Sequence, residues 1–116
     1  MLIPGALKVY VARDKTDLRK SYNGLSMLVQ DVLQQDPLSG HLFVFFNRGL
    51  DKVKVLYWDK NGFCLWQKRL ETGRFPPRSF DQPTFVMSFQ EFQMVLGGID
   101  LHRLPPRKEV KGCRVN

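Results

Sequence analysis

The sequence predicts an α+β fold: an antiparallel β-sheet of four to five strands, with one long helix packed on a face and a short C-terminal helix. Three observations predict it. Short runs rich in β-branched and aromatic residues end at turn residues, which is typical of strands. One run repeats apolar residues every three or four positions, which is typical of a helix. The length of 116 residues favours a single domain.

Five runs have the composition of strands. In chain order they read "KVYVA" (8–12), "HLFVFF" (41–46), "KVKVLYW" (52–58), "FCLWQKRL" (63–70) and "TFVM" (84–87), the last a short edge strand. Very short turns separate the second, third and fourth runs. These three must be antiparallel neighbours, because parallel strands need long crossovers.

The long helix is expected within residues 13–36. Its apolar residues recur at helical spacing: Leu18, Tyr22, Leu25, Val29, Val32 and Leu33. Asp14 or Thr16 could cap its start, and Asp36-Pro37 should end it. The sequence therefore predicts a helix that spans most of the distance between the first two strands.

A capping box marks the start of the short C-terminal helix. Ser88 stands three residues before Glu91, the spacing at which each side chain can bond the other's backbone N–H. An apolar stripe follows at Phe89, Phe92, Leu96 and Ile99. We expect one domain over residues 1–101 and a flexible basic tail over residues 102–116.

Charge is the most informative bulk property. The chain has 18 Lys and Arg against 11 Asp and Glu, a net charge of +7. The excess is concentrated in residues 41–80, with eight basic and three acidic residues, and in residues 102–116, with five and one. Such a concentration favours a nucleic-acid partner.

Several other classes of protein are not predicted. No apolar run approaches the roughly 20 residues of a membrane helix, and the N-terminus lacks a signal-peptide layout. A cytoplasmic protein with no membrane partner is expected. The two cysteines, Cys64 and Cys113, make no metal or disulfide framework, so no metal or cofactor is predicted.

The hairpin within "VLYWDKNGFCLWQKRLETGRF" (55–75) divides into two faces. Its turn is Asn61-Gly62 or Lys60-Asn61, and strand alternation gives the same faces in either register. The face expected to form core under the long helix carries Val53, Val55, Tyr57, Cys64, Trp66 and Leu70, with Lys68 among them. The other carries Lys52, Lys54, Leu56, Trp58, Leu65, Gln67 and Arg69.

The second face is the candidate nucleic-acid interface. In the Asn61-Gly62 register Lys54 lies opposite Arg69, an unfavourable like-charge pair that an anionic partner would relieve. The cations would contact phosphates and Trp58 would pack on DNA. The predicted binding residues are Arg19, Lys20, Arg48, Lys52, Lys54, Trp58, Arg69 and Arg74. The alternative is that Leu56, Trp58 and Leu65 form ordinary core under the second helix.

Arg19 and Lys20 are expected to open the long helix, where cations oppose the helix dipole. A phosphate contact would explain their position. An ion pair with Asp17, or simple exposure to solvent, would explain it equally well. Arg48, in a turn, and Arg74, in a loop, are candidate phosphate contacts by the same argument.

An enzyme is not predicted. Metal-dependent strand transfer needs clustered carboxylates, whereas Asp14, Asp17, Asp36, Asp51 and Asp59 fall at expected caps and turns. The two histidines, His41 and His102, have no cysteine or carboxylate at ligand spacing. No catalytic residue is therefore assigned.

Three stretches in order, "TDLRKSYNGL", "DPLSGHLFVFFNR" and "LYWDKNGFCLWQKRLETGRF", carry a resemblance. Over about residues 3–104 the chain resembles the accessory proteins of bacterial insertion-sequence-66-type transposable elements. These TnpB-like proteins are unrelated to the RNA-guided nucleases that share the label. The chain departs from the family pattern at residues 75–78: members often have a Trp-Pro pair, and this chain reads Phe-Pro-Pro-Arg.

The resemblance implies a protein encoded beside a separate transposase and needed for transposition, with no established catalytic residues. The first hypothesis is a non-enzymatic accessory factor that binds DNA at the element ends. The alternative is a protein-interaction adaptor that binds the transposase, with Trp58 and Leu56 as an apolar anchor. The oligomeric state is not predicted.

Overall fold

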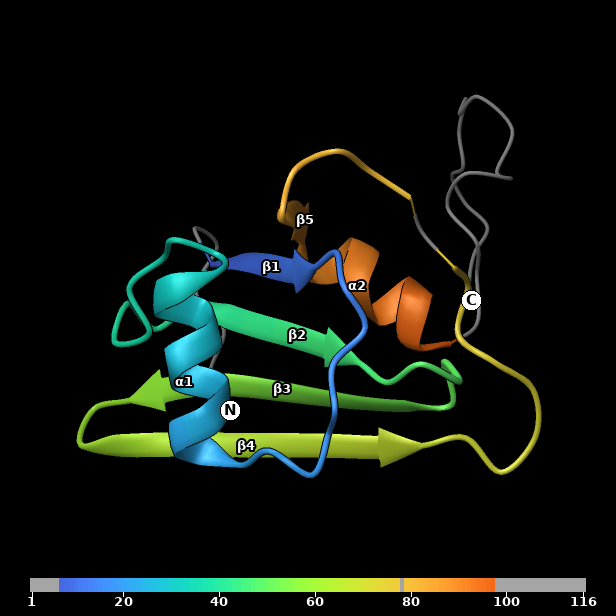
Figure 1. Ribbon diagram of the computed structural model, residues 1–116, viewed down its shortest axis with the longest axis horizontal. Helices are drawn as coiled ribbons and strands as arrows, with labels where there is room; N and C mark the ends of the chain where they lie inside the picture. The colour runs from blue at the N-terminus through green and yellow to red at the C-terminus, as the bar shows by residue number, and fades with distance from the viewer. Residues whose placement is uncertain (1–6, 78, 98–116) are drawn as a thin grey trace.

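The computed structural model describes residues 7–77 and 79–97. Within them the chain forms five strands and two helices (Figure 1). In order these are β1 (Lys8–Ala12), α1 (Tyr22–Asp31), β2 (Leu42–Phe46), β3 (Lys52–Asp59), β4 (Gly62–Arg69), β5 (Thr84–Ser88) and α2 (Phe89–Leu96). The predicted α+β class is confirmed, and each predicted strand has a counterpart.

The five strands form one sheet in the order β4-β3-β2-β1-β5. β2, β3 and β4 are antiparallel neighbours, as the short turns predicted, and β5 is an edge strand antiparallel to β1. β1 and β2 are parallel, so the prediction of a wholly antiparallel sheet is wrong at this pair. The connection between them carries α1 and is long enough for a parallel crossover.

The long helix predicted within residues 13–36 is also wrong, because α1 is 10 residues long. Before α1 the backbone makes hydrogen bonds that a helix would not allow: the Thr16 N–H donates to the carbonyl of the last residue of β2 (2.8 Å). The Asp17 carboxylate accepts the Arg19 N–H (3.0 Å), which closes a local turn. The N-cap is Ser21, not Asp14 or Thr16, so the helix starts only after this turn.

The end of α1 precedes the predicted stop at Asp36-Pro37. Gln34 has a left-handed backbone with φ 57°, a conformation that an α-helix does not contain. The Gln35 N–H donates to the Val29 carbonyl (3.0 Å), which closes the last turn. The chain therefore leaves the helix before the proline.

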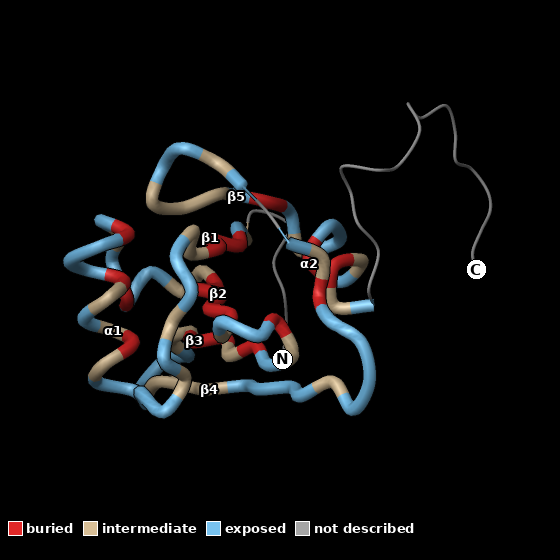
Figure 2. The backbone as a smooth tube through the Cα atoms, turned by 45° about the vertical axis from the view of Figure 1, so that its right-hand side comes forward, coloured by how far each residue is buried: buried red, intermediate tan, exposed pale blue. Residues whose placement is uncertain are grey.

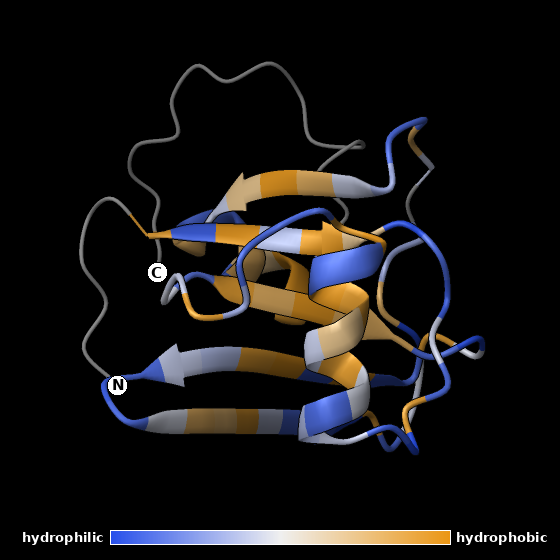
Figure 3. Cartoon of the chain, turned by 60° about the vertical axis from the view of Figure 1, so that its left-hand side comes forward, coloured by the Kyte–Doolittle hydropathy of each residue, from blue (hydrophilic) through white to orange (hydrophobic). Residues whose placement is uncertain are grey.

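The two helices cover opposite faces of the sheet (Figure 2). Under α1 lies a cluster made of Tyr10, Leu25, Val29, Leu33, Phe43, Phe45 and Leu56. On the α2 face lies a larger cluster made of Val9, Val11, Leu42, Val44, Phe46, Leu50, Val53, Val55, Phe75, Met87, Phe92 and Val95. Figure 3 shows apolar residues, in orange, along the strands that lie behind α1.

The assignment of helices to faces is the reverse of the one predicted. Val53 and Val55 lie on the α2 face, whereas Leu56 lies under α1. All five residues of β2 are buried, so the pattern of this strand does not distinguish the face that each helix covers. Only the packing of the whole chain decides it.

Trp66 was predicted to be core, and this is wrong: its exposed fraction is 43%. It pairs with Val55 across the hairpin and so points to the α2 face. However, β4 is an edge strand, and α2 packs against β5 and β1 at the far side of the sheet. The helix does not extend over Trp66.

The capping box at the start of α2 is confirmed. The Ser88 Oγ accepts the Glu91 N–H (3.1 Å), and the Glu91 carboxylate accepts the Ser88 N–H (2.9 Å). Phe92 and Val95 are the buried residues of the helix. Ile99 and the predicted tail at 102–116 lie outside the described residues.

Candidate functional site

An open groove of about 910 Å³ lies beside the end of the hairpin at which β3 begins and β4 ends. We call it the basic groove. Its lining includes seven basic residues (Lys15, Arg19, Arg48, Lys52, Lys54, Lys68 and Arg69) and two acidic ones (Asp17 and Glu71). The other lining residues are Thr16, Leu18, Asn47, Gly49, Val53 and Gln67. Residues from three separate parts of the chain therefore gather at one place.

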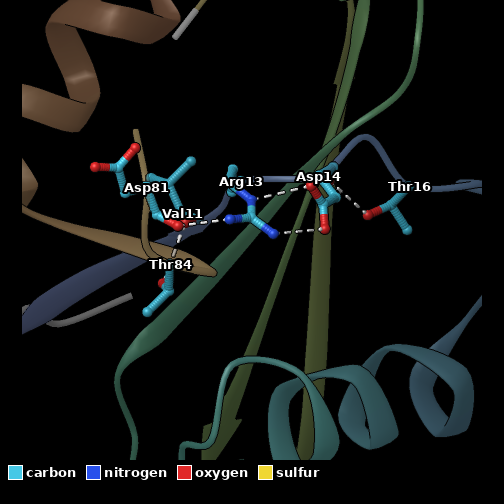
Figure 4. Close-up of polar contacts among 6 residues, drawn as sticks. All are labelled: Val11, Arg13, Asp14, Thr16, Asp81 and Thr84. Atoms are coloured by element: carbon cyan, nitrogen blue, oxygen red, sulfur yellow. Dashed lines mark hydrogen bonds and ion pairs between the residues drawn. The ribbon is translucent and has the colours of Figure 1, made fainter. Parts of the chain in front are cut away.

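One side of the basic groove comes from residues 13–21, the crossing segment, which passes over the sheet from β1 to α1 (Figure 1). Its first residues are fixed by polar contacts (Figure 4). The Arg13 guanidinium pairs with Asp14 (3.1 Å) and donates to the Asp81 carbonyl. The Thr16 hydroxyl contacts the Asp14 carbonyl (3.4 Å). These contacts hold the segment at the end of β1.

The far end of the crossing segment is held by a cation of β3. The Lys54 ammonium donates to the carbonyl oxygen of Lys20 (3.1 Å). Lys54 is half-buried, whereas Lys20 is exposed. Lys54 therefore both lines the groove and fixes the segment that forms its side.

Arg19 makes a two-pronged ion pair with Asp17. Its Nε lies 3.0 Å from one carboxylate oxygen and its Nη2 lies 2.6 Å from the other. The Arg19 hydrogen bonds hold the pKa of Asp17 far below its usual range, so the carboxylate stays ionised from neutral to clearly acidic pH. The pKa of Arg19 is raised by the same contact. The ion pair considered for Arg19 is therefore present, and it orients the exposed guanidinium at the groove.

The β2–β3 turn presents Arg48. The Asn47 amide oxygen accepts the N–H groups of Asp51 (3.1 Å) and Lys52 (3.0 Å), and its NH₂ donates to the Asp51 carboxylate (2.7 Å). This last bond is the main reason that the pKa of Asp51 is lowered. Leu50 adopts a left-handed φ of 58° in the turn. The network leaves Arg48 exposed at the tip.

The hairpin register decides which charges oppose each other. Its two-residue turn is Lys60-Asn61, since Asp59 pairs with Gly62, and Lys60 has φ 56°. Lys54 then lies opposite Gln67, so the predicted Lys54–Arg69 pair is wrong. Lys52 lies opposite Arg69 instead, and a like-charge cross-strand pair still exists at the groove.

Five of the eight predicted binding residues line the basic groove: Arg19, Arg48, Lys52, Lys54 and Arg69. Lys20 contributes its carbonyl oxygen to the Lys54 bond, but it is not among the lining residues. Arg74 is exposed in the loop after β4, outside the lining.

Trp58 lies near the turn end of the hairpin, away from the basic groove. It is half-buried, with its ring edge-on to Phe63 (centroids 5.1 Å apart). Leu56 is completely buried. The predicted face therefore separates into a cationic end, a buried middle and an aromatic end.

Two basic lining residues were missed from the sequence. Lys15 falls inside the helix that was predicted too long, where it looks like an ordinary solvent-facing cation. Lys68 alternates onto the α2 face, where its ammonium donates to the Leu96 carbonyl at the end of α2 (3.3 Å). No sequence signal identifies Lys68, because its place depends on how α2 packs.

The charge of the groove is predominantly positive. Its carboxylates, Asp17 and Glu71, each pair with an arginine, Arg19 and Arg69. Within residues 7–77 and 79–97, no group of three or more potential metal ligands is found. In the same part of the chain, no helix has the length and apolar character to span a membrane.

The comparisons with known proteins agree with the resemblance noted in the sequence. The chain is similar to two proteins of Sinorhizobium fredii (strain NBRC 101917 / NGR234), both named as uncharacterized. It is 37% identical to y4jC over 105 residues, which cover 90% of this chain and 89% of y4jC. It is 38% identical to y4hO over 94 residues, which cover 81% and 82% of the two chains.

No solved structure matches the chain. The family described as IS66 Orf2 like protein matches residues 7–106, which include every described residue. The chain therefore belongs to the IS66 Orf2-like family, whose members are accessory proteins associated with transposition.

Proposed function

We propose that this protein binds DNA through the basic groove, as a non-enzymatic accessory factor in transposition of an IS66-type element. The observation that carries the proposal is the gathering of seven basic residues, against two acidic ones, along one open groove. Clustered cations of this kind match the regular charge of a phosphate backbone. Such a role would place the protein with the DNA in the bacterial cytoplasm.

The arrangement of charges supports an anionic partner. Lys52 and Arg69 remain opposite each other although the pair is unfavourable alone. Both carboxylates of the groove are already paired with arginines. Lys15, Arg48 and Lys52 make no ion pair with any carboxylate of the described residues. A bound phosphate backbone would neutralise this excess.

The direct test is the salt dependence of binding to element-end DNA. We expect log affinity to fall linearly with log salt, by about 0.9 for each phosphate contact, so that four to six contacts give a slope of roughly −4 to −5. Fluorescence anisotropy of a labelled duplex over a series of salt concentrations measures it. Absence of binding at about 50 mM salt would refute the proposal.

A second candidate is an adaptor that binds the transposase. Leu56 cannot serve as its anchor because it is fully buried. An exposed side chain on the α2 face, Trp66, is a better anchor, and it lies beside the half-buried Tyr57 and Cys64. Exposed tryptophans are frequent hot spots of protein interfaces.

The adaptor hypothesis predicts that Trp66→Ala abolishes co-purification with the element's transposase without changing the far-UV circular dichroism spectrum. Trp66 is nearly half exposed, so its truncation removes little core packing. Trp58→Ala is the comparison, because that ring packs on Phe63 within the hairpin. Undiminished co-purification of the Trp66 variant argues against this anchor.

A further inference from the structure

The basic groove contains no aromatic ring among its lining residues. Residues 1–6, 78 and 98–116, which the structure does not describe, contain no Phe, Tyr or Trp. Every Phe, Tyr and Trp of the protein therefore lies at a described position. The groove is lined by cations, two carboxylates, a few neutral polar residues, Gly49, Leu18 and Val53.

The aromatic rings are used elsewhere. Phe43, Phe45 and Phe75 are completely buried. The two most exposed rings are Tyr22 (46%) and Trp66 (43%). Tyr22 begins α1 outside the lining, and Trp66 points to the α2 face of the sheet. Neither ring is among the residues that line the groove.

Single-stranded and duplex DNA make different demands on such a surface. Proteins that hold single strands combine a basic channel with aromatic rings, and each stacked base adds substantially to affinity. A duplex keeps its bases stacked inside and presents phosphates at higher charge density, so it loses nothing on a surface without rings. The basic groove has the charge but lacks the stacking platform.

Three polar side chains of the groove are held by contacts within the protein. Asn47, an amide of the type that reads adenine in the major groove, uses its oxygen and its NH₂ within the β2–β3 turn. Arg19 and Arg69 are each held by a carboxylate. These contacts hold the three side chains in place, which suits contact with a DNA backbone.

We propose that the basic groove takes the phosphate backbone of duplex DNA in preference to single-stranded DNA. This inference rests on the proposed function, because it names the form of DNA that the same groove recognises. Backbone contacts position a protein on DNA and carry no direct sequence information. The groove alone would therefore bind element ends and unrelated duplexes similarly.

The test compares the full-length protein on a duplex of about 25 base pairs and on each of its separated strands, at about 0.1 M salt, by fluorescence anisotropy. The duplex is expected to bind at least about tenfold more tightly than either strand. Tyr22→Ala and Trp66→Ala should leave both affinities within about twofold, because neither ring lies in the groove.

The opposite results separate the two proposals. Equal or tighter binding of single strands overturns the duplex preference, as does weaker strand binding in Tyr22→Ala or Trp66→Ala. If strands bind as tightly as the duplex and Arg48→Gln with Lys52→Gln weakens both, the groove still binds DNA and only this inference fails. If the wild-type protein binds neither form, the proposed function fails as well.

Discussion

Replacing Arg48 and Lys52 together by glutamine is expected to weaken binding to duplex DNA about 50-fold at 0.1 M salt. Each lost phosphate contact removes about 0.9 from the slope of log affinity against log salt, so the slope should become less steep by roughly 2. Both residues are exposed and line the basic groove. Anisotropy titrations at several salt concentrations give the affinity and the slope together.

A matched control distinguishes the groove from the overall charge. Lys8→Gln with Lys60→Asn removes the same two charges at the other end of the sheet, where both lysines are exposed. Asparagine suits position 60 because it tolerates the left-handed φ of 56° found there. The control should bind DNA within about threefold of wild type. Equal losses in the two double variants would mean that net charge, not the groove, drives binding.

Lys52→Gln by itself also tests the effect of this charge on stability. Lys52 lies opposite Arg69, so Lys52→Gln relieves a like-charge pair. The free energy of unfolding should stay the same or rise slightly while DNA binding falls. Loss of both binding and stability would instead indicate that Lys52 has a structural role.

Phe75→Ala is expected to lower the free energy of unfolding by about 3–5 kcal/mol. Phe75 is completely buried in the cluster on the α2 face, with its ring centroid 5.4 Å from that of Phe46. Its N–H also donates to the Leu50 carbonyl (2.7 Å). A loss of this size is a large part of the roughly 5–15 kcal/mol that a domain has.

The effect should reach beyond one cavity, because Phe75 anchors the loop that returns the chain from β4 to β5. Urea unfolding followed by circular dichroism measures it, with Phe75→Leu expected to lose far less. Arg74→Ala, at the exposed neighbouring position, should leave the free energy of unfolding within about 0.5 kcal/mol. A loss below about 1 kcal/mol for Phe75→Ala would contradict the anchoring role.

The local elements of this protein were determined by short patterns in the sequence. The alternating runs around residues 53–57 and 84–87 predicted strands, and the Ser88–Glu91 spacing predicted the capping box, because each depends on neighbours a few positions apart. The short turns likewise fixed the antiparallel order of β2, β3 and β4. Strand alternation assigned Lys52 and Arg69 to a common face in either register.

Other features were decided only by contacts between distant parts of the chain. Leu18, in the crossing segment, stands at helical spacing from Tyr22 and Leu25. However, the Thr16 N–H bonds to β2 and the Asp17 carboxylate closes a turn, so the segment is not helical. The same crossover makes β1 parallel to β2. All five residues of β2 are buried, so the strand is apolar on both faces. Its sequence therefore does not indicate which helix covers which face.

In the candidate site, too, some residues could be predicted from the sequence and others are placed only by the tertiary structure. The sequence identified five of the cations that line the basic groove, since exposed charges on one strand face or in a turn are visible locally. Lys15 and Lys68 were not identifiable, and Trp58 was placed with the cations although it lies away from the groove. Alternation determines the face on which a side chain lies, whereas its neighbours along and across that face depend on register, edge position and helix packing. These are set by the tertiary structure, through contacts between residues that are far apart in the chain.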